Sequence, residues 1–373
     1  MRKSRLNNKI LSGRNCVLGS YSNYKVAVLF GGASPEHEVS LSSSYNIIKG
    51  LLGAGFSVCP IGINKAGSWF YYYGDIEKIK TGEWELKDNC SAIIGYSGSQ
   101  KGILKIKEDG RFEVLDIDVV FAVLHGENGE DGTVQGLLEL SGIPYVGCGV
   151  LSSSICINKI LTHTVLDVAG IKCARWRAIK KNCVENMESL LKDVADELSF
   201  PIFTKPSSCG SSVGIKKCRN LKELEDGVNF AFKYGDEVIC EEFIKGKEVE
   251  CAVLQTGSSE IKSSSVGQIE FYDDFYDYDS KYKSYSKIII PANLKDSVVK
   301  QVQSIAIKVF KAMRCSGLAR VDFFVDDGDN VYVNEINTMP GFTDISMYPK
   351  LWEHSGLSYK DLLINLVSVA IKK

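Results

Sequence analysis

The chain has 373 residues, of which 44 are basic and 46 acidic, and 45% are hydrophobic. That length exceeds what one ordinary hydrophobic core needs, so we expect a folded protein of two or three domains. Because the charges nearly cancel, the chain lacks the net positive field that gathers nucleic acid or an anionic membrane surface, and we expect neither as a partner.

The N-terminal residues and the apolar runs of the chain indicate where in the cell the protein is located. Residues 1–24 hold five basic side chains but no apolar stretch suited to a signal peptide, and we interpret them as a disordered extension. No later segment has the roughly eighteen uninterrupted apolar residues that cross a bilayer. The 12 cysteines form no C-x-x-C pair, which favours reduced thiols. We therefore expect a cytoplasmic protein.

The first predicted domain, residues 25–149, alternates strands with helices. Its opening apolar run ends at Gly31 and Gly32, and its last helical stretch is stopped by Gly142. Alternation of this kind predicts an open parallel sheet with helices on its faces, an α/β fold. We expect strands at residues 25–30, 56–63 and 119–124, and helices at residues 39–52 and 133–140.

The second region, residues 150–245, has the mixed pattern of a small α+β unit. A helix is predicted from about Ser154 to Ala169, where Gly170 stops it. The strand FPIFTKP leads into a Gly/Ser loop at residues 207–214. We then expect a helix at residues 221–234 and a strand at residues 237–244.

The third region, residues 246–373, opens with the alternating strand KEVECAVL. A segment rich in tyrosine and acidic residues follows at 271–287, and its length and makeup are typical of a lid over an active site. A long helix is predicted at residues 296–313. The region closes with two strands, GLARVDFFV and NVYVNEIN, joined by turn residues at 327–329.

This terminal hairpin predicts a metal site. Because side chains alternate along a strand, Arg320 and Asp322 share one face of the first strand, and Glu335 and Asn337 share one face of the second. With a two-residue hairpin turn, all four fall on the same face of the sheet. Two carboxylates and an amide oxygen are hard ligands that suit Mg²⁺ or Mn²⁺, so we expect Asp322, Glu335 and Asn337 to bind metal. A solvated face with Arg320 paired to Glu335 is the alternative, and the turn at residues 338–341, whose N–H groups can face an anion, argues against it.

The loop at residues 207–214 predicts a contact with phosphate. Small residues allow backbone amides to approach phosphate oxygens, and Lys205 and Lys159 supply positive charge. The sequence contains no P-loop motif, and Ser152 stands where the third glycine of the partial G-x-G-x-x-G match would be. An oxidoreductase that binds a dinucleotide is therefore disfavoured.

Together these motifs resemble the ATP-grasp superfamily and, within it, the D-alanine:D-alanine ligase family, over nearly everything from Lys25 to Lys373. The resemblance implies an N-terminal substrate domain and a two-subdomain ATP-grasp fold. It also implies an enzyme that joins two D-alanine molecules through an acyl phosphate, forming ADP and phosphate, for peptidoglycan precursor synthesis, and it suggests a homodimer. The motifs are GGASPEHEVSL at 31–41, LHGENGEDGTVQG at 124–136, KPSSCGSSVG at 205–214, DYDSKY at 277–282, ARVDFF at 319–324 and NEINTMPGFTDISMYPKLW at 334–352.

For the first D-alanine, the resemblance implies that Glu36 binds the ammonium group. His125 and Glu130 would lie nearby. Ser211 and Tyr282 would form a hydrogen-bonded group with Glu36 that fastens the lid over the site.

For the second D-alanine, the resemblance implies that Arg320 and the Gly341 N–H hold the tetrahedral oxyanion. Ser346 and Lys281 would receive the carboxylate. Met347 presents an apolar side chain that suits a methyl group.

For ATP, the resemblance implies that Lys159 and Lys205 contact the α- and β-phosphates and that Lys281 reaches the γ-phosphate from the lid. Two Mg²⁺ or Mn²⁺ ions would lie at the predicted metal ligands. The residues expected around adenine and ribose are Glu241, Glu242, Phe243, Ile244 and Glu248.

The sequence departs from the family pattern in the residues beside two expected phosphate ligands. Ile157 and Asn158 precede Lys159 where the family usually has Met-Asp, and Ser208 and Cys209 replace more usual polar residues. Neither departure removes an expected ligand.

Two alternatives remain. One is a D-alanine:D-serine ligase, although arginine is common in such ligases where this chain has Met347. The other is a non-catalytic ATP-binding module on the same fold.

Overall fold

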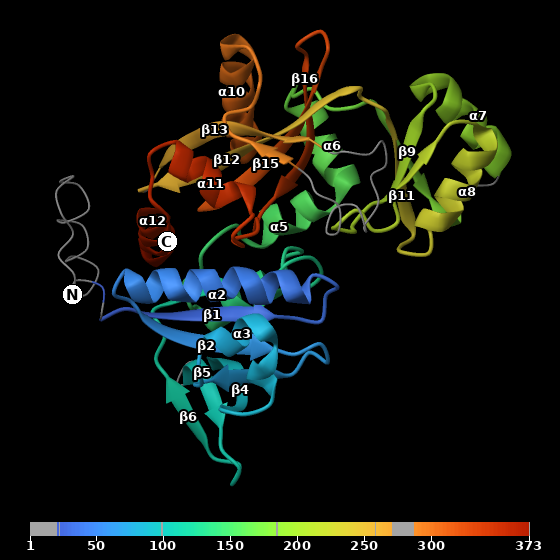
Figure 1. The fold of residues 1–373 in the computed structure, drawn as a ribbon. Coiled ribbons are helices and arrows are strands. Elements are labelled where there is room, and N and C mark those ends of the chain that lie inside the picture. The colour runs from blue at the N-terminus through green and yellow to red at the C-terminus, as the bar shows by residue number, and fades with distance from the viewer. Residues whose placement is uncertain are drawn as a thin grey trace.

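The computed structural model describes residues 21, 23–97, 100–183, 186–257, 259–270 and 287–372 (Figure 1). Nearly all of the expected N-terminal extension lies outside these ranges, as do residues 271–286 of the expected lid, with Lys281 and Tyr282. Among the described helices, none is both long and apolar enough to span a membrane.

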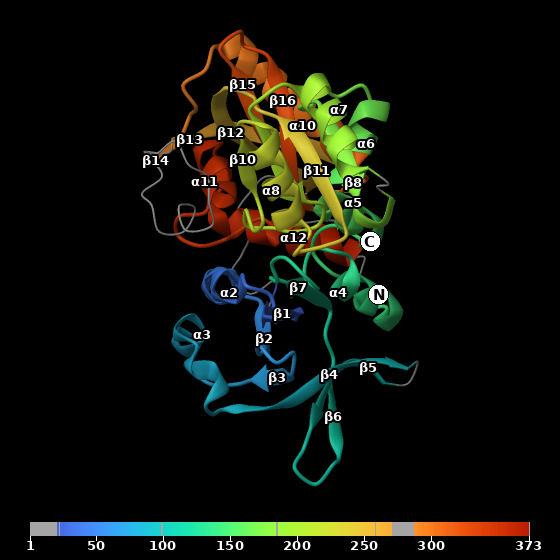
Figure 2. The same cartoon turned by 90° about the vertical axis from the view of Figure 1, so that its right-hand side faces the viewer.

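The N-terminal part of the chain forms a seven-stranded sheet in the order β6-β5-β4-β3-β2-β1-β7. Strands β1 (Lys25–Gly31), β2 (Ser57–Ile63) and β7 (Val119–Ala122) run parallel, as the sequence predicts. An antiparallel meander that the sequence analysis did not identify extends this sheet away from the rest of the molecule (Figure 2). Its strands are β3 (Trp69–Tyr72), β4 (Asn89–Ser97), β5 (Gln100–Ile106) and β6 (Phe112–Leu115).

Helix α2 (His37–Gly53) lies against β1 and is the longest helix of this part. Its Ser40, Ser43 and Ser44 are fully buried, because small side chains allow the helix to approach the sheet closely. Ser40 Oγ accepts a hydrogen bond from Gly31 N at 2.8 Å and donates one to Val123 O. The remaining helices here are α3 (Glu77–Thr81), the 3-10 turn η1 (Glu83–Glu85) and α4 (Thr133–Ser141).

Two helices, α5 (Val150–Ile157) and α6 (Lys159–Val168), occupy the segment where we predicted a single helix. Asn158 between them has an extended backbone, with φ −91° and ψ 106°, and its side chain accepts from Leu161 N at 3.0 Å. The prediction of one continuous helix was wrong because asparagine caps a helix more readily than it continues one. The break leaves Lys159 at the first turn of α6, where its N–H donates to Ser207 O at 2.7 Å.

A four-stranded antiparallel sheet, in the order β10-β9-β11-β8, forms the central part. Helices α7 and α8 pack on one face of it and bury an apolar core (Figure 1). The elements are β8 (Trp176–Lys180), the 3-10 turn η2 (Lys181–Cys183), α7 (Met187–Leu198), β9 (Ile202–Pro206), β10 (Lys216–Cys218), α8 (Leu221–Ala231) and β11 (Glu237–Glu242).

A five-stranded antiparallel sheet, in the order β14-β13-β12-β15-β16, forms the C-terminal part. One face packs against α10, and the other packs against α11 and α12 (Figure 1). The elements are β12 (Gly246–Thr256), β13 (Glu260–Glu270), β14 (Lys287–Ile289), α10 (Asp296–Ala312), β15 (Leu318–Asp326), β16 (Val331–Asn337), α11 (Met347–His354) and α12 (Tyr359–Lys372).

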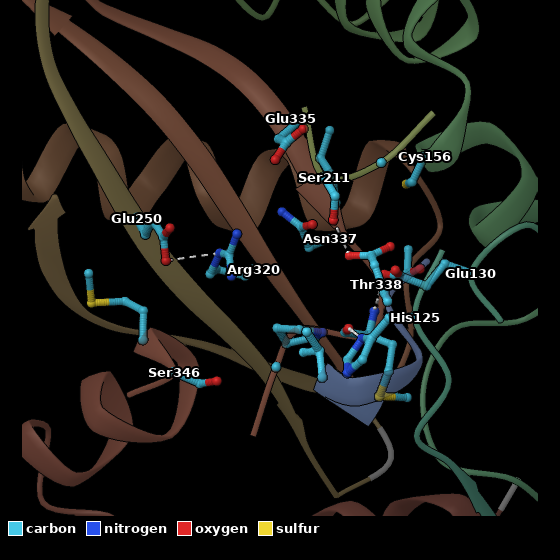
Figure 3. A pocket seen from close by; sticks show the side chains of 18 of the residues that line it. His125, Glu130, Cys156, Ser211, Glu250, Arg320, Glu335, Asn337, Thr338 and Ser346 are labelled. Atoms are coloured by element: carbon cyan, nitrogen blue, oxygen red, sulfur yellow. Dashed lines mark hydrogen bonds and ion pairs between the residues drawn. The ribbon is translucent and has the colours of Figure 1, made fainter. Parts of the chain in front are cut away.

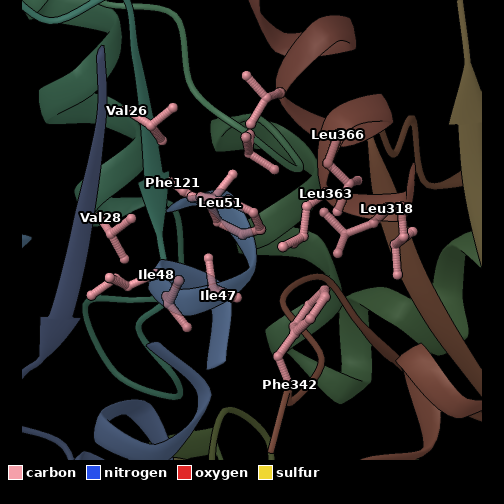
Figure 4. Close-up of a cluster of buried hydrophobic side chains, with 14 of the residues drawn as sticks. Val26, Val28, Ile47, Ile48, Leu51, Phe121, Leu318, Phe342, Leu363 and Leu366 are labelled. Atoms are coloured by element: carbon pink, nitrogen blue, oxygen red, sulfur yellow. The ribbon is translucent and has the colours of Figure 1, made fainter. Parts of the chain in front are cut away.

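One hydrophobic core joins the N-terminal and C-terminal parts. Ile47 and Leu51 of α2 lie in the same buried cluster as Leu363 and Leu366 of α12 (Figure 4). Phe342, 1% exposed, belongs to this cluster although its neighbours in the chain form a loop. Burial of this kind stabilises by about 25 cal/mol per Å² of apolar surface, so the two parts form one packed body.

Candidate functional site

Two adjoining pockets lie where the three sheets meet. The first is bounded by Glu36 on the N-terminal side and by Arg320 on the C-terminal sheet. Figure 3 shows Arg320 and Asn337 among the residues that line it. The second is bounded by Lys205 and Glu241 of the central sheet. Residues that line both are Lys159, Cys209, Gly210, Ser211, Asn334 and Glu335.

The Gly/Ser loop of the central part reaches Glu36 directly. Ser211 Oγ donates to Glu36 Oε1 at 2.5 Å (Figure 3). Ser211 and Ser212 have φ values of 52° and 58°, a left-handed backbone that turns the loop toward the N-terminal part. A Cβ on Gly126 would lie only 2.6 Å from Glu36 Oε2, so this position requires glycine for the carboxylate to fit.

Half-buried Glu130 and buried His125 line the same pocket as Glu36. Glu130 Oε2 accepts from Gly126 N at 2.9 Å, and Oε1 accepts from Met339 N at 3.2 Å. Burial, with the nearby charge of Glu36, raises the pKa of Glu130 to about 8. Burial also lowers the pKa of His125, whose Nδ1 lies 3.1 Å from Met339 O. Both shifts favour the uncharged forms of Glu130 and His125.

Arg320 lies at the opposite wall, between two buried carboxylates. Its Nε and Nη2 donate to the two oxygens of Asp322, each at 2.7 Å, and Nε lies 2.9 Å from Glu250 Oε2. Asn337 Nδ2 also donates to Asp322, at 2.9 Å. Burial alone would lower the pKa of Arg320, but Asp322 and Glu250 outweigh burial and raise it, so the guanidinium stays charged.

The last two strands pair as predicted and the turn lies at the predicted residues 327–329, but the two-residue turn assumed for that pairing is not present. Arg320 lies opposite Asn337, and Asp322 lies opposite Glu335. The connection is a three-residue loop closed by Asp326 N and Asn330 O at 3.1 Å, and the register then shifts between Asp322 and Phe323. An odd-length loop alone would put these residues out of register, and the extra residue of the bulge restores them.

The bulge places Asn334 in both pockets, a position that the sequence analysis did not predict. Asp322 is only 2% exposed, so the hairpin face is not the solvated one of the alternative reading.

Asp322, Glu335 and Asn337 have the chemistry of a site for a hard cation. Three carboxylates, those of Asp322, Glu250 and Glu335, surround the single guanidinium of Arg320, and a divalent cation would offset the excess of negative charge. Glu335 and Asn337 line the pocket, whereas Asp322 is covered by Arg320. Among the described residues, no group of three His, Cys, Asp or Glu side chains is close enough to bind metal by itself.

Glu241 organises the second pocket. Lys205 Nζ lies 2.6 Å from its Oε2, and His163 Nε2 lies 3.2 Å from its Oε1. Burial would raise the pKa of Glu241, but Lys205 and His163 outweigh burial and hold it well below its usual range. His163, 1% exposed, was not predicted from the sequence.

Lys159 lies where the two pockets join. Its Nζ donates to Cys209 O at 2.6 Å, and burial lowers its pKa while Glu335 opposes the change. A partly buried cation beside a loop of small residues is suited to binding phosphate.

The structure brings together nearly all the sequence-predicted residues that it describes. The first pocket is lined by Glu36, His125, Glu130, Ser211, Arg320, Glu335, Asn337, Gly341, Ser346 and Met347. The second is lined by Lys159, Lys205, Glu241, Glu242, Phe243, Ile244 and Glu248.

One lining residue had a signal that could have identified it. Glu250 lies two residues after Glu248 on β12, so the alternation of that strand puts both on the pocket side.

Comparison with known proteins gives one consistent result. The sequence model of the family "D-ala D-ala ligase N-terminus" matches residues 25–148, and that of "D-ala D-ala ligase C-terminus" matches residues 165–368. The chain is 47% identical to a D-alanine–D-alanine ligase of Acetivibrio thermocellus over 365 residues, covering 94% of this chain and 96% of that protein. It is 44% identical to the enzyme of the same name from Clostridium acetobutylicum, covering 94% of this chain and 98% of that protein.

Solved structures show the same fold. A D-Ala:D-Ser ligase from Enterococcus faecalis is 40% identical with a TM-score of 0.85, covering 93% of this chain and 99% of that one. A D-alanine-D-alanine ligase from Coxiella burnetii is 37% identical with a TM-score of 0.82, covering 94% of each chain.

Proposed function

The chain belongs to the D-alanine–D-alanine ligase family, and from that premise we propose how its two pockets divide the reaction. It is an ATP-dependent ligase that joins two D-alanine molecules for cell wall synthesis. We assign the first pocket to the amino acids and the second to the nucleotide. The observation that supports this division most directly is that Lys159, Ser211 and Glu335 line both pockets, so phosphate chemistry takes place where they meet.

The first D-alanine binds beside Glu36 in this proposal. The carboxylate of Glu36 pairs with the ammonium group, while burial keeps Glu130 largely protonated and His125 neutral at pH 7. A charge removed from water is costly unless it is paired, and here one carboxylate would pair with one ammonium group.

ATP occupies the second pocket. Lys159 and Lys205 contact its α- and β-phosphates, and Glu241 with its neighbours to Ile244 binds adenine. Glu248 accepts from the ribose hydroxyls.

A carboxylate oxygen of the first D-alanine then attacks the γ-phosphorus in line, and ADP leaves. The product is an acyl phosphate. Asp322, Glu335 and Asn337 would hold two Mg²⁺ or Mn²⁺ ions, which supply positive charge beside the phosphates when bound.

The second D-alanine is held by Ser346 next to Met347. Its amine nitrogen attacks the acyl carbon, phosphate leaves, and Arg320 with the Gly341 N–H stabilises the tetrahedral oxyanion. Lys281 and Tyr282, the remaining residues assigned to the γ-phosphate, the second carboxylate and the lid, belong to the segment outside the described residues.

The domain boundaries, the oligomeric state and the location in the cell are proposed from the same family membership. We assign residues 25–149 to an N-terminal substrate domain, and residues 150–245 and 246–373 to the two ATP-grasp subdomains. We also propose a homodimer in the cytoplasm, where its substrate ATP is made.

A D-alanine:D-serine ligase is the second candidate, because a ligase of that specificity is 40% identical to this chain. Met347 favours D-alanine. Its side chain is 4% exposed, and a Cβ on Gly267 would lie only 2.6 Å from its sulfur, so it is held tightly as an apolar wall. Such a wall offers no hydrogen bond to a serine hydroxyl.

One experiment separates the candidates. The protein is incubated with ATP, Mg²⁺ and an equimolar mixture of D-alanine and D-serine, and the products are identified by mass. We expect D-alanyl-D-alanine to predominate. Predominance of D-alanyl-D-serine would reverse the choice of substrate, and ATP binding without phosphate release would indicate the non-catalytic module.

A further inference from the structure

The loop at residues 341–346 holds two residues assigned above to the second D-alanine, Gly341 and Ser346. Within the loop, Thr343 N donates to Ser346 Oγ at 2.9 Å, and Ser346 N donates to Thr343 O at 3.0 Å. A Cβ on Gly341 would lie 2.7 Å from Ser346 Oγ, so the two residues are in close contact. A displacement of any part of this loop therefore moves both groups.

Two side chains of helix α2 hold the backbone at Phe342. Phe342 N donates to Ser43 Oγ at 3.1 Å, and Asn46 Nδ2 donates to Phe342 O at 3.0 Å. Asn46 Nδ2 also donates to Asp344 Oδ1 at 3.0 Å. These hydrogen bonds join positions nearly 300 residues apart in the chain. Two of them involve the backbone N–H and C=O groups of Phe342.

The same helix begins directly after Glu36, the residue assigned to the first D-alanine. Asn46 lies ten residues further along, which at 1.5 Å per residue is about 15 Å. Ser40 between them is fully buried and bonded to the backbone of Gly31 and Val123, so α2 is fixed to the sheet.

We propose that α2 sets the relative position of the two amino-acid subsites, and that Asn46 is the positioning residue for the second. This inference rests on the proposed function for the identity of the substrates. Asn46 touches no reacting atom. It acts through Phe342, whose flanking peptide groups lead to Gly341 on one side and to Thr343 on the other.

The packing of the Phe342 ring alone does not fix the orientation of the loop backbone. The ring lies 6.1 Å from that of Phe121 and 5.6 Å from that of Tyr348, centroid to centroid, which anchors the loop in depth. Apolar contacts of this kind are not directional, whereas hydrogen bonds are. The amide of Asn46 therefore supplies the orientation that the ring does not.

The two contacts of Asp344, one with Asn46 and one with Lys80, allow a matched control. Its Oδ1 contacts Asn46, and its Oδ2 lies 3.7 Å from Lys80 Nζ in an exposed ion pair. Exposed ion pairs contribute little to stability, so K80A should leave the loop in place.

The test variants change Asn46 itself. N46A and N46D both remove the donor to Phe342 O, and N46D keeps the size of the side chain. The double variant N46D/D344N exchanges donor and acceptor between positions 46 and 344 and so restores that one hydrogen bond.

The experiment measures two quantities on the full chain and its variants. Amide hydrogen exchange over residues 341–346 reports the loop without any need for activity. We expect faster exchange there in N46A and N46D, wild-type exchange in K80A, and partial recovery in N46D/D344N. If exchange in N46A equals that of the wild type, the inference is wrong whether or not the chain is a ligase.

Steady-state kinetics provide the second measurement. We expect kcat/KM for D-alanine to fall about tenfold in N46A, with KM for ATP unchanged, since the loss of one or two hydrogen bonds has an effect of this order. A merely structural role would instead lower Tm and raise both KM values together, and that pattern would also refute the inference. Absence of dipeptide synthesis in the wild type would refute the proposed function and leave the exchange result standing.

Discussion

Glu250 Oε2 lies 2.9 Å from Arg320 Nε, and residue Glu250 is 4% exposed. Arg320 thus has a second buried acid besides Asp322, on the neighbouring strand β12, where Glu250 lies directly opposite Asp322. Two acids, one on the same strand and one on the neighbouring strand, hold the guanidinium in place, as the oxyanion role proposed for Arg320 requires.

We expect E250Q to lower kcat about tenfold while KM for ATP stays unchanged. The glutamine keeps the shape of the side chain but removes the negative charge, so Arg320 loses one of its two ion pairs and is held less firmly on that side. The exposed Glu260 on β13 provides the control, and E260Q should behave as the wild type. A kcat for E250Q within twofold of the wild type would show that Asp322 alone positions Arg320.

We expect H163L to raise KM for ATP about tenfold with little change in KM for D-alanine. Leucine would remove the ring nitrogen that lies 3.2 Å from Glu241 Oε1 and helps to lower the pKa of this buried carboxylate, and a buried charge that loses a partner is costly. H163Q retains an N–H donor and should recover most of the affinity. Equal KM values for the leucine and glutamine variants would contradict a polar role for His163.

We expect the wild type to lose stability between pH 5 and pH 8 more steeply than E130Q. The pKa of Glu130 is about 8 in the folded protein, against about 4.3 for an exposed glutamate. Between these values the folded state keeps a proton that the unfolded state has lost, so the free energy of unfolding falls as pH rises, by a few kcal/mol.

Urea unfolding at several pH values measures this difference. The pKa of His125 is lowered, so His125 acts in the opposite direction, but it is present in both proteins and cancels in the comparison. Parallel pH profiles for the two proteins would contradict the raised pKa.

We expect G341A to lower kcat at least tenfold. The added Cβ would meet Ser346 Oγ at 2.7 Å, and the loop would have to move by some tenths of an ångström, which displaces the Gly341 N–H from the oxyanion. G136A is the control, since a Cβ on Gly136 of helix α4 meets nothing within 4 Å. Unchanged kcat in G341A would mean that this amide is not part of the oxyanion site.

The elements with strong local patterns were predicted well. The parallel strands β1, β2 and β7 and the long helix α10 lie where periodicity placed them, and the family resemblance is confirmed by the match of both family models. The errors have local causes. Asn158 ends a helix by capping the next one, and the bulge at Asn334 adds one residue to a regular alternation.

Motifs and the family resemblance predicted most of the residues that line the two pockets, and the alternation of side chains along the last two strands predicted which of them share a face. The contacts that hold those residues in place became visible only in the folded chain. Glu250 contacts Arg320 because strands β12 and β15 pair within one sheet. His163 contacts Glu241, and Asn46 contacts Phe342, because helices pack against a separate sheet and a separate loop. Periodicity describes a side chain's direction relative to its own strand or helix, and it contains no information about which distant element that side chain will face.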